Sequence, residues 1–198
     1  MKPTIISALL ILFLSKGFGQ FKSYGIFKSG YYIDSSGNHI SGLLKYNIGY
    51  DRFADHKYGD SRLIYKAIID ADKIKFNSGL IMGFVINDDS FAVINNVHVF
   101  GSVYPKEFAQ VLETGTIELF EYASVGGNGT SFNDVRVFIL KKGPGQWEVI
   151  KKNFMEIMES CISDDAELMS LVKNKVLKYK DLREIVHRYN VFKTKENS

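Results

Sequence analysis

Residues 21–150 consist of short β-type runs separated by turn residues, and this pattern constrains the fold of the chain more than any other feature. Short runs of β-type residues follow one another here, and no helical period separates them. Residues 30–34 lead into Ser-Ser-Gly-Asn and return as residues 40–46, a pattern typical of a β-hairpin. Further β-type runs cover residues 62–69, 73–76, 80–86, 91–100, 107–113, 116–122, 134–141 and 146–150. Because connections this short join antiparallel neighbours, we predict an antiparallel meander of about eight to ten strands, curled into a barrel-like or sandwich body.

The apolar period changes after residue 150. Two sets of residues recur at i, i+3, i+4 and i+7, the spacing that puts apolar side chains on one face of a helix. The first set is Phe154, Ile157, Met158 and Cys161, and the second is Leu182, Ile185, Val186 and Tyr189. Between them, Asp164 and Glu167 have the spacing of a capping box that opens a further helix. We therefore predict about three C-terminal helices packed on the sheet, a frayed polar tail at residues 193–198, and an α+β fold that is mainly β.

The first residues are typical of a secretory signal peptide. Lys2 supplies a positive charge, residues 5–14 are a nearly unbroken apolar run, and Gly17 and Gly19 are spaced like a cleavage site. Ten helical residues rise only about 15 Å, roughly half the hydrocarbon core, which disfavours a membrane anchor. No later run is long and apolar enough to span a bilayer. We predict a signal peptide at 1–19 and a single globular domain at 20–198, with a β-rich body at 20–150 and a helical segment at 151–190.

Charge and cysteine content argue against a nucleic-acid-binding protein and exclude a protein stabilised by an intramolecular disulfide. The leader holds two lysines and no acid, so the mature chain has 25 − 2 = 23 Lys and Arg residues against 22 Asp and Glu residues. These charges are mixed along the sequence, whereas nucleic-acid binding normally needs a basic stripe, so we expect no nucleic-acid partner. Cys161 is the only cysteine, which excludes an intramolecular disulfide. Stability must come from packing.

Aromatic residues make up 14% of the chain, which leaves two interpretations open. The favoured one is a β-rich core, because most of these residues alternate with polar residues as strand residues do. The alternative is a face that stacks on sugars or other ring-shaped ligands.

No stretch of the sequence forms a recognisable catalytic or metal site. The four histidines, His39, His56, His98 and His187, lie far apart, so only the fold could assemble a metal site from them. Residues 51–60 hold three Asp and a His and are interpreted as a solvated loop, with acid/base or calcium chemistry as the alternative. The glycine-rich residues 126–130 lack the Lys-Ser/Thr pair of a phosphate loop and are interpreted as a flexible turn. Cys161 lies on an apolar helical stripe and is expected to be buried and unreactive.

Three stretches together resemble a group of uncharacterised exported proteins of Gram-negative bacteria. These are the hairpin of residues 30–44, the segment 108–119, and the end of the chain from Tyr179 through Tyr189-Asn190. The resemblance implies export, a β-rich body and a helical end that closes on Tyr-Asn, and it brings no activity with it. Asn190 is interpreted as a residue that ends the last helix, with a recognition tip as the alternative.

These observations favour a soluble, non-catalytic binding or interaction module that works in the periplasm or outside the cell. Its partner would be another envelope protein or a small apolar or glycan ligand. The alternatives are a hydrolytic enzyme whose site is assembled only by the fold, and a structural envelope component. The sequence assigns no catalytic residue, no metal ligand and no cofactor.

Overall fold

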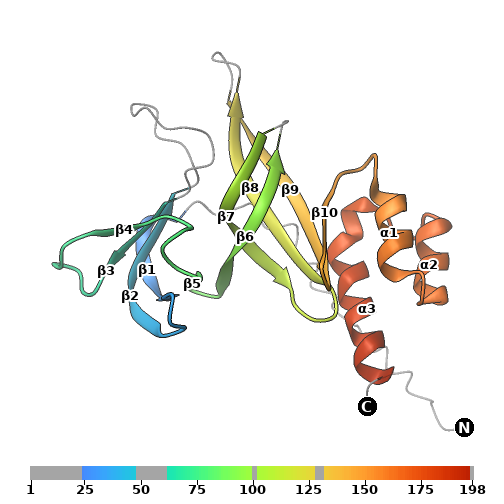
Figure 1. The fold of residues 1–198 in the computed structure, drawn as a ribbon, viewed down its shortest axis with the longest axis horizontal. Coiled ribbons are helices and arrows are strands. Elements are labelled where there is room, and N and C mark those ends of the chain that lie inside the picture. The colour runs from blue at the N-terminus through green and yellow to red at the C-terminus, as the bar shows by residue number, and fades with distance from the viewer. Residues whose placement is uncertain (1–23, 48–61, 100–101, 128–131, 197–198) are drawn as a thin grey trace, which may run out of the picture.

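The computed structural model describes residues 24–47, 62–99, 102–127 and 132–196. These residues form one antiparallel sheet followed by three α-helices, so the predicted mainly β, α+β fold is confirmed. The helices lie at the opposite end of the molecule from strands β1 to β4 (Figure 1).

Ten strands make up the sheet. The first five are β1 (Tyr24–Ile33), β2 (His39–Asn47), β3 (Arg62–Lys66), β4 (Ile74–Phe76) and β5 (Gly83–Ile86). The next five are β6 (Asp89–Val99), β7 (Ser102–Glu113), β8 (Glu118–Gly127), β9 (Phe132–Lys142) and β10 (Gly145–Val149). Their order is β10-β9-β8-β7-β6-β5-β1-β2-β3-β4. The sequence left open whether the sheet is barrel-like or a sandwich. The structure has a single ten-stranded sheet that does not close.

One connection breaks the simple meander. Strand β5 pairs with β1 and not with β4, the strand before it in the chain. Gly30 of β1 permits this close pairing, because a Cβ there would lie 2.0 Å from the carbonyl oxygen of Val85. The loop between β4 and β5 carries Ile81 into the core, and Ser78 Oγ in this loop donates to the carbonyl oxygen of Lys106 in β7 at 2.7 Å.

The two halves of the sheet bury opposite faces. In β6, Phe91 and Val93 point to one face, whereas Ala92 and Ile94 point to the other, as the two-residue period of a strand requires. The first face is buried over β1 to β7 by an aromatic core that includes Tyr46, Phe84, Phe91 and Phe108. The second face is buried over β6 to β9, where β10 approaches β6 and Gln146 Nε2 donates to the carbonyl oxygen of Asn95 at 2.8 Å. The sheet therefore curves in opposite directions in its two halves.

The helices cover the outside of the β7 to β10 half. They are α1 (Phe154–Ile162), α2 (Ala166–Lys173) and α3 (Leu182–Glu196), with a 3₁₀ turn, η1 (Tyr179–Asp181), before the last. Both predicted apolar stripes are buried, and they pack with sheet residues that include Leu119, Leu140 and Val149. Burial of these stripes, and not helix propensity alone, holds the helices in place.

Two local predictions at the helical end are wrong. Asp165, and not Asp164, caps α2, and its Oδ1 accepts a hydrogen bond from the backbone N–H of Leu168 at 2.9 Å. The predicted frayed tail is helical as far as Glu196, because Phe192 packs on the core and Lys193 forms ion pairs.

Candidate functional site

The candidate binding surface is the outer face of strands β1 to β5, the side opposite the aromatic core. Cross-strand pairing defines its rows, because residues directly opposite each other in neighbouring strands share a face. Tyr31, Ser41 and Val85 form one row, and Lys45, Ile64 and Lys75 form another. The described side chains of the outer face include Phe27, Ser29, Tyr31, Ile33, His39, Ser41, Leu43, Lys45, Arg62, Ile64, Lys66, Lys75 and Val85. Each of these residues is exposed or half-buried, so no described element covers the outer face.

Charge on the outer face has one sign. It carries Lys45, Arg62, Lys66 and Lys75, and its described residues include no Asp or Glu. The carboxylates that the structure describes between β1 and the start of β6 lie elsewhere. Asp34, Asp70, Asp72 and Asp88 are in turns or at strand ends, and Asp89 pairs with Ile86 on the core side. Among the described residues of β1 to β5 and their turns, the bases of the outer face are therefore separated from the acids.

Two ring contacts organise the outer face. The ammonium of Lys66 lies 5.5 Å from the ring centroid of Phe27, and its Nζ also donates to the carbonyl oxygen of Ile69. Tyr31 stacks on His39 with the ring centroids 4.7 Å apart. The outer face is thus basic and aromatic over β1 to β4, with Ser29 between Phe27 and Tyr31 on β1 and Ser41 opposite Tyr31 on β2.

Most of the aromatic residues that the structure describes lie elsewhere, in the core. Tyr46, Phe84, Phe91 and Phe108 pack on one another with ring centroids 4.6–6.1 Å apart. These residues bear out the core interpretation of the high aromatic content. Phe27 and Tyr31 are exceptions, because both lie on the outer face.

The residues that the sequence singled out do not converge on one site. His39 lies on the outer face, His98 on β6 and His187 on α3, while His56 is outside the described residues. Across the described ranges, no group of three or more His, Cys, Asp or Glu side chains is placed to hold a metal ion. The loop at 51–60 is also outside them. Gly126 and Gly127 are the last residues of β8 and not part of a turn, and 128–130 are not described.

Cys161 is fully buried on α1, as predicted. Burial raises the pKa of its thiol, although the nearby Lys142 acts in the opposite direction. A buried thiol of raised pKa stays protonated at neutral pH and is a poor nucleophile.

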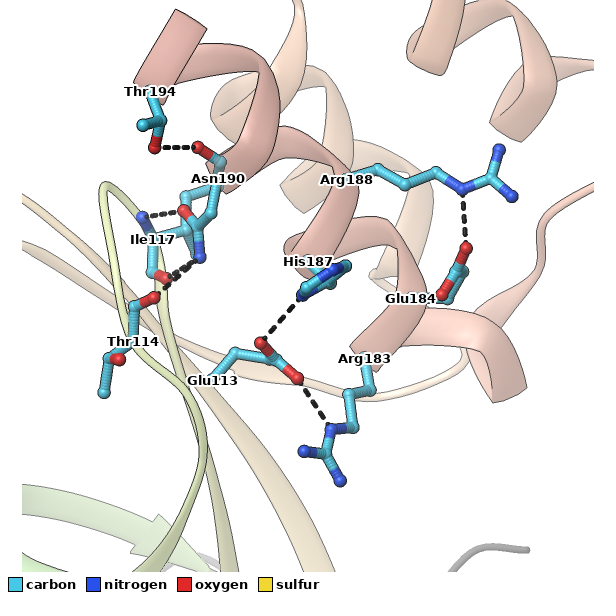
Figure 2. A network of polar contacts seen from close by, with 9 residues as sticks. All are labelled: Glu113, Thr114, Ile117, Arg183, Glu184, His187, Arg188, Asn190 and Thr194. Atoms are coloured by element: carbon cyan, nitrogen blue, oxygen red, sulfur yellow. Dashed lines mark hydrogen bonds and ion pairs between the residues drawn. The ribbon is translucent and has the colours of Figure 1, made fainter. Parts of the chain in front are cut away.

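Asn190 fastens α3 to the turn between β7 and β8 (Figure 2). Its Oδ1 accepts from the backbone N–H of Ile117 at 2.8 Å, and its Nδ2 donates to the carbonyl oxygens of Ile117 and Thr114 at 2.8 and 3.3 Å. Gly115 makes room for this amide, because a Cβ there would lie 2.6 Å from Asn190 Cγ. The interpretation of Asn190 as a residue that ends the helix is wrong, since α3 continues for six residues beyond it.

A second set of polar contacts supports the same docking. Glu113 Oε1 accepts from Arg183 Nε at 2.7 Å, and Glu113 Oε2 lies 3.3 Å from His187 Nδ1 (Figure 2). Arg188, by contrast, points away from the sheet and pairs within its own helix with Glu184. Glu113 therefore joins the end of β7 to the first half of α3.

A groove of about 570 Å³ runs between α2 and α3 and is the second candidate site. Its walls include Glu167 and Leu171 from α2 and Arg188, Val191 and Lys195 from α3. Asp164 lies at its edge, where both of its oxygens accept from the hydroxyl of the buried Tyr189 at 2.9 Å and Oδ2 pairs with Lys193. Lys142 Nζ donates to the same hydroxyl at 2.7 Å.

The pKa shifts of Asp164 and Tyr189 point to a structural role for these two residues. Burial and the Asp164 carboxylate raise the pKa of Tyr189 well above its usual range, so the phenol stays protonated. Burial raises the pKa of Asp164, but hydrogen bonds from Lys193 and Tyr189 outweigh this effect and lower it. A catalytic acid or base works best with a pKa near the operating pH, and both shifts move away from neutrality. The groove is therefore bordered by groups that fix the helices.

Sequence reasoning missed the outer face because its residues come from separate strands. Lys45 and Lys75 are thirty positions apart in the chain, and they become neighbours on either side of Ile64 only through the β2-β3-β4 register. One signal was present in the sequence: the residues of strands β1 to β5 include bases and no acid.

No helix of the described ranges is long and apolar enough to cross a membrane. Comparison of the chain with protein-family models, with curated proteins and with solved structures found no match.

Proposed function

We propose that this protein is exported and acts as a non-catalytic binding module, with the outer face of β1 to β5 as the surface that holds its ligand. Export is supported by the charged, apolar and small-residue segments of residues 1–19. Mass spectrometry of protein recovered from the periplasm or the medium tests this part. The expected mature chain begins at or near Gln20, and an intact Met1 terminus there would contradict export with cleavage.

The observation that carries the binding function is the one-signed charge of the outer face. Lys45, Lys66 and Lys75 lie on three adjacent strands, and the described residues of this face include no carboxylate, in a chain whose mature net charge is only about +1. Such a segregated surface raises the local concentration of anions and favours complementary partners. The half-buried Phe27, Leu43 and Ile64 add apolar contact area between the charges.

The other two functions have less support. A hydrolase would need, in a concave site, titratable groups whose pKa values lie near neutral pH. At the α2–α3 groove, the pKa of Asp164 is lowered and that of Tyr189 is raised, so both move away from neutral pH. A polymerising envelope component would need an unguarded edge strand. Edge strand β4 has only three residues, and an exposed lysine, Lys75, is the middle one.

The proposed function is tested by measuring binding of the mature protein to immobilised poly-L-glutamate at increasing NaCl. The double variant Lys45→Glu/Lys75→Glu reverses the charge of the two lysines on either side of Ile64 on the outer face. The control variant Lys151→Glu/Lys152→Glu makes the same charge change between β10 and α1. We expect the first variant to bind at least about tenfold more weakly, because charge pairs contribute directly to association. The control should stay within about twofold of the wild type. Equal losses in both variants, or no binding by the wild type, would refute the assignment of this face.

A further inference from the structure

We infer that the ligand of the outer face is an acidic polysaccharide, a chain of sugars that carry carboxylates. This inference rests on the proposed function and specifies the ligand class for the same surface. Three features carry it: the spread of the bases, the aromatic rings beside them, and the hydroxyl residues around those rings.

The bases are spread along the face and do not converge on one point. Neighbouring strands lie about 4.8 Å apart, so the backbones of Lys45 and Lys75 are separated by roughly 10 Å across β3. A small anion is normally held by donors that point at one position, as in a helix N-terminus or a backbone nest. A row of separate charges suits a polymer that presents one negative group after another.

The rings favour sugars over other polyanions. Tyr31 is half-buried, and its ring packs on His39 at 4.7 Å, which holds it in place on the outer face. A ring held in position offers an apolar surface at a small entropic cost, and its hydroxyl adds a hydrogen-bonding group. Ser41 lies directly opposite Tyr31, and Ser29 lies two residues before it on the same strand face. Apolar ring surface next to hydroxyl groups matches the two sides of a sugar ring.

An anionic membrane surface fits the same face less well. The exposed pair Ile68 and Ile69 lies in the β3–β4 turn beside Lys66, as a membrane-inserting tip would. However, Asp70 and Asp72 occupy the same turn, and Asp34 lies in the turn between β1 and β2. These carboxylates would be repelled by anionic headgroups. A flexible polymer chain can lie along the strands and avoid them.

The test compares three soluble polymers and one vesicle. A polyuronate such as alginate carries carboxylates on sugar rings, poly-L-glutamate carries carboxylates without sugars, and dextran carries sugars without charge. Vesicles of phosphatidylglycerol and phosphatidylethanolamine represent the membrane. Affinities of the mature protein are measured by calorimetry at one fixed salt concentration, with Tyr31→Ala as the variant and Tyr31→Phe as the conservative control.

We expect the polyuronate to bind at least about fivefold more tightly than poly-L-glutamate, and dextran to bind weakly or not at all. Tyr31→Ala should remove this preference, whereas Tyr31→Phe should keep most of it, since the ring remains. Equal affinity for the two carboxylate polymers would overturn the polysaccharide inference and leave the proposed anion-binding function standing. Vesicle binding tighter than polyuronate binding would overturn it as well. If the wild-type protein bound none of the polymers, both the polysaccharide inference and the proposed anion-binding function would be overturned.

Discussion

At the scale of single residues, two polar side chains form hydrogen bonds and ion pairs that join segments distant in sequence. Asn190 binds a turn more than seventy residues away, and Asp164 joins the loop before α2 to Tyr189 and Lys193 of α3. Asn190 is half-buried and the hydroxyl of Tyr189 is buried, and such groups are costly to leave without partners. Asn190 and Asp164 looked like helix-boundary residues in the sequence, because Asn and Asp are common at helix ends.

Substitution of Asn190 by alanine should destabilise the protein by about 1–3 kcal/mol, because it strips hydrogen bonds from the backbone of the β7–β8 turn. Urea denaturation measures this loss. Arg188→Ala on the same helix is the matched control and should cost less than about 1 kcal/mol, since its partner Glu184 is solvent-exposed. If the two variants lose equal stability, Asn190 does not hold the turn.

Substitution of Asp164 by asparagine should change the pH dependence of stability. The folded-state pKa of Asp164 is lowered from its ordinary value of 3.8, so its contribution is present above that pH and is lost as the pH falls through the folded-state pKa. At pH 7 we expect Asp164→Asn to melt a few degrees, on the order of 2 °C, below the wild type, because the half-exposed pair is partly screened. The gap should narrow as the pH falls below 3.8. A gap that stays the same from pH 7 into the acidic range would show that the carboxylate charge is irrelevant there, and Glu184→Gln serves as the exposed control.

At the scale of elements, the sequence predicted what local patterns determine. Alternating residues and turn chemistry located all ten strands, and the i, i+3, i+4, i+7 stripes located α1 and α3, because both signals depend on near neighbours in the chain. The pairing of β5 with β1 was not predictable, since residues 34–82 separate the two strands in the chain. The identity of the uncovered face follows from that pairing and from the opposite curvature of the two halves.

Removal of α3 should unfold or aggregate the remainder of the protein. Its stripe of Leu182, Ile185, Val186 and Tyr189 is fully buried against the sheet and the other helices. Burying each such side chain contributes about 1.5–3 kcal/mol before entropy, and the sum is comparable to the whole net stability of a domain. A mature chain that ends at Lys178 should therefore show a large drop in melting temperature. Melting within a degree or two of the full mature chain would show instead that α3 is a detachable arm.

At the scale of the whole molecule, the two ends of the sheet differ in how their faces are covered. The end formed by β7 to β10 is covered by helices, and its polar side chains fasten those helices. The end formed by β1 to β5 buries one face in the aromatic core and leaves the other open, basic and partly aromatic. Binding at the open end would leave the helical end free to supply stability.

The measurement that tests this division most directly is an NMR titration of the isotopically labelled mature protein with a short oligouronate. We predict that amide shifts change along β1, β2 and β3, with the largest changes near Tyr31, Lys45 and Lys66, and that α1 to α3 stay unchanged. The affected resonances should return to their starting positions as salt is added, since the attraction is between charges. Shift changes confined to the α2–α3 groove, or none at all at millimolar ligand, would contradict the account.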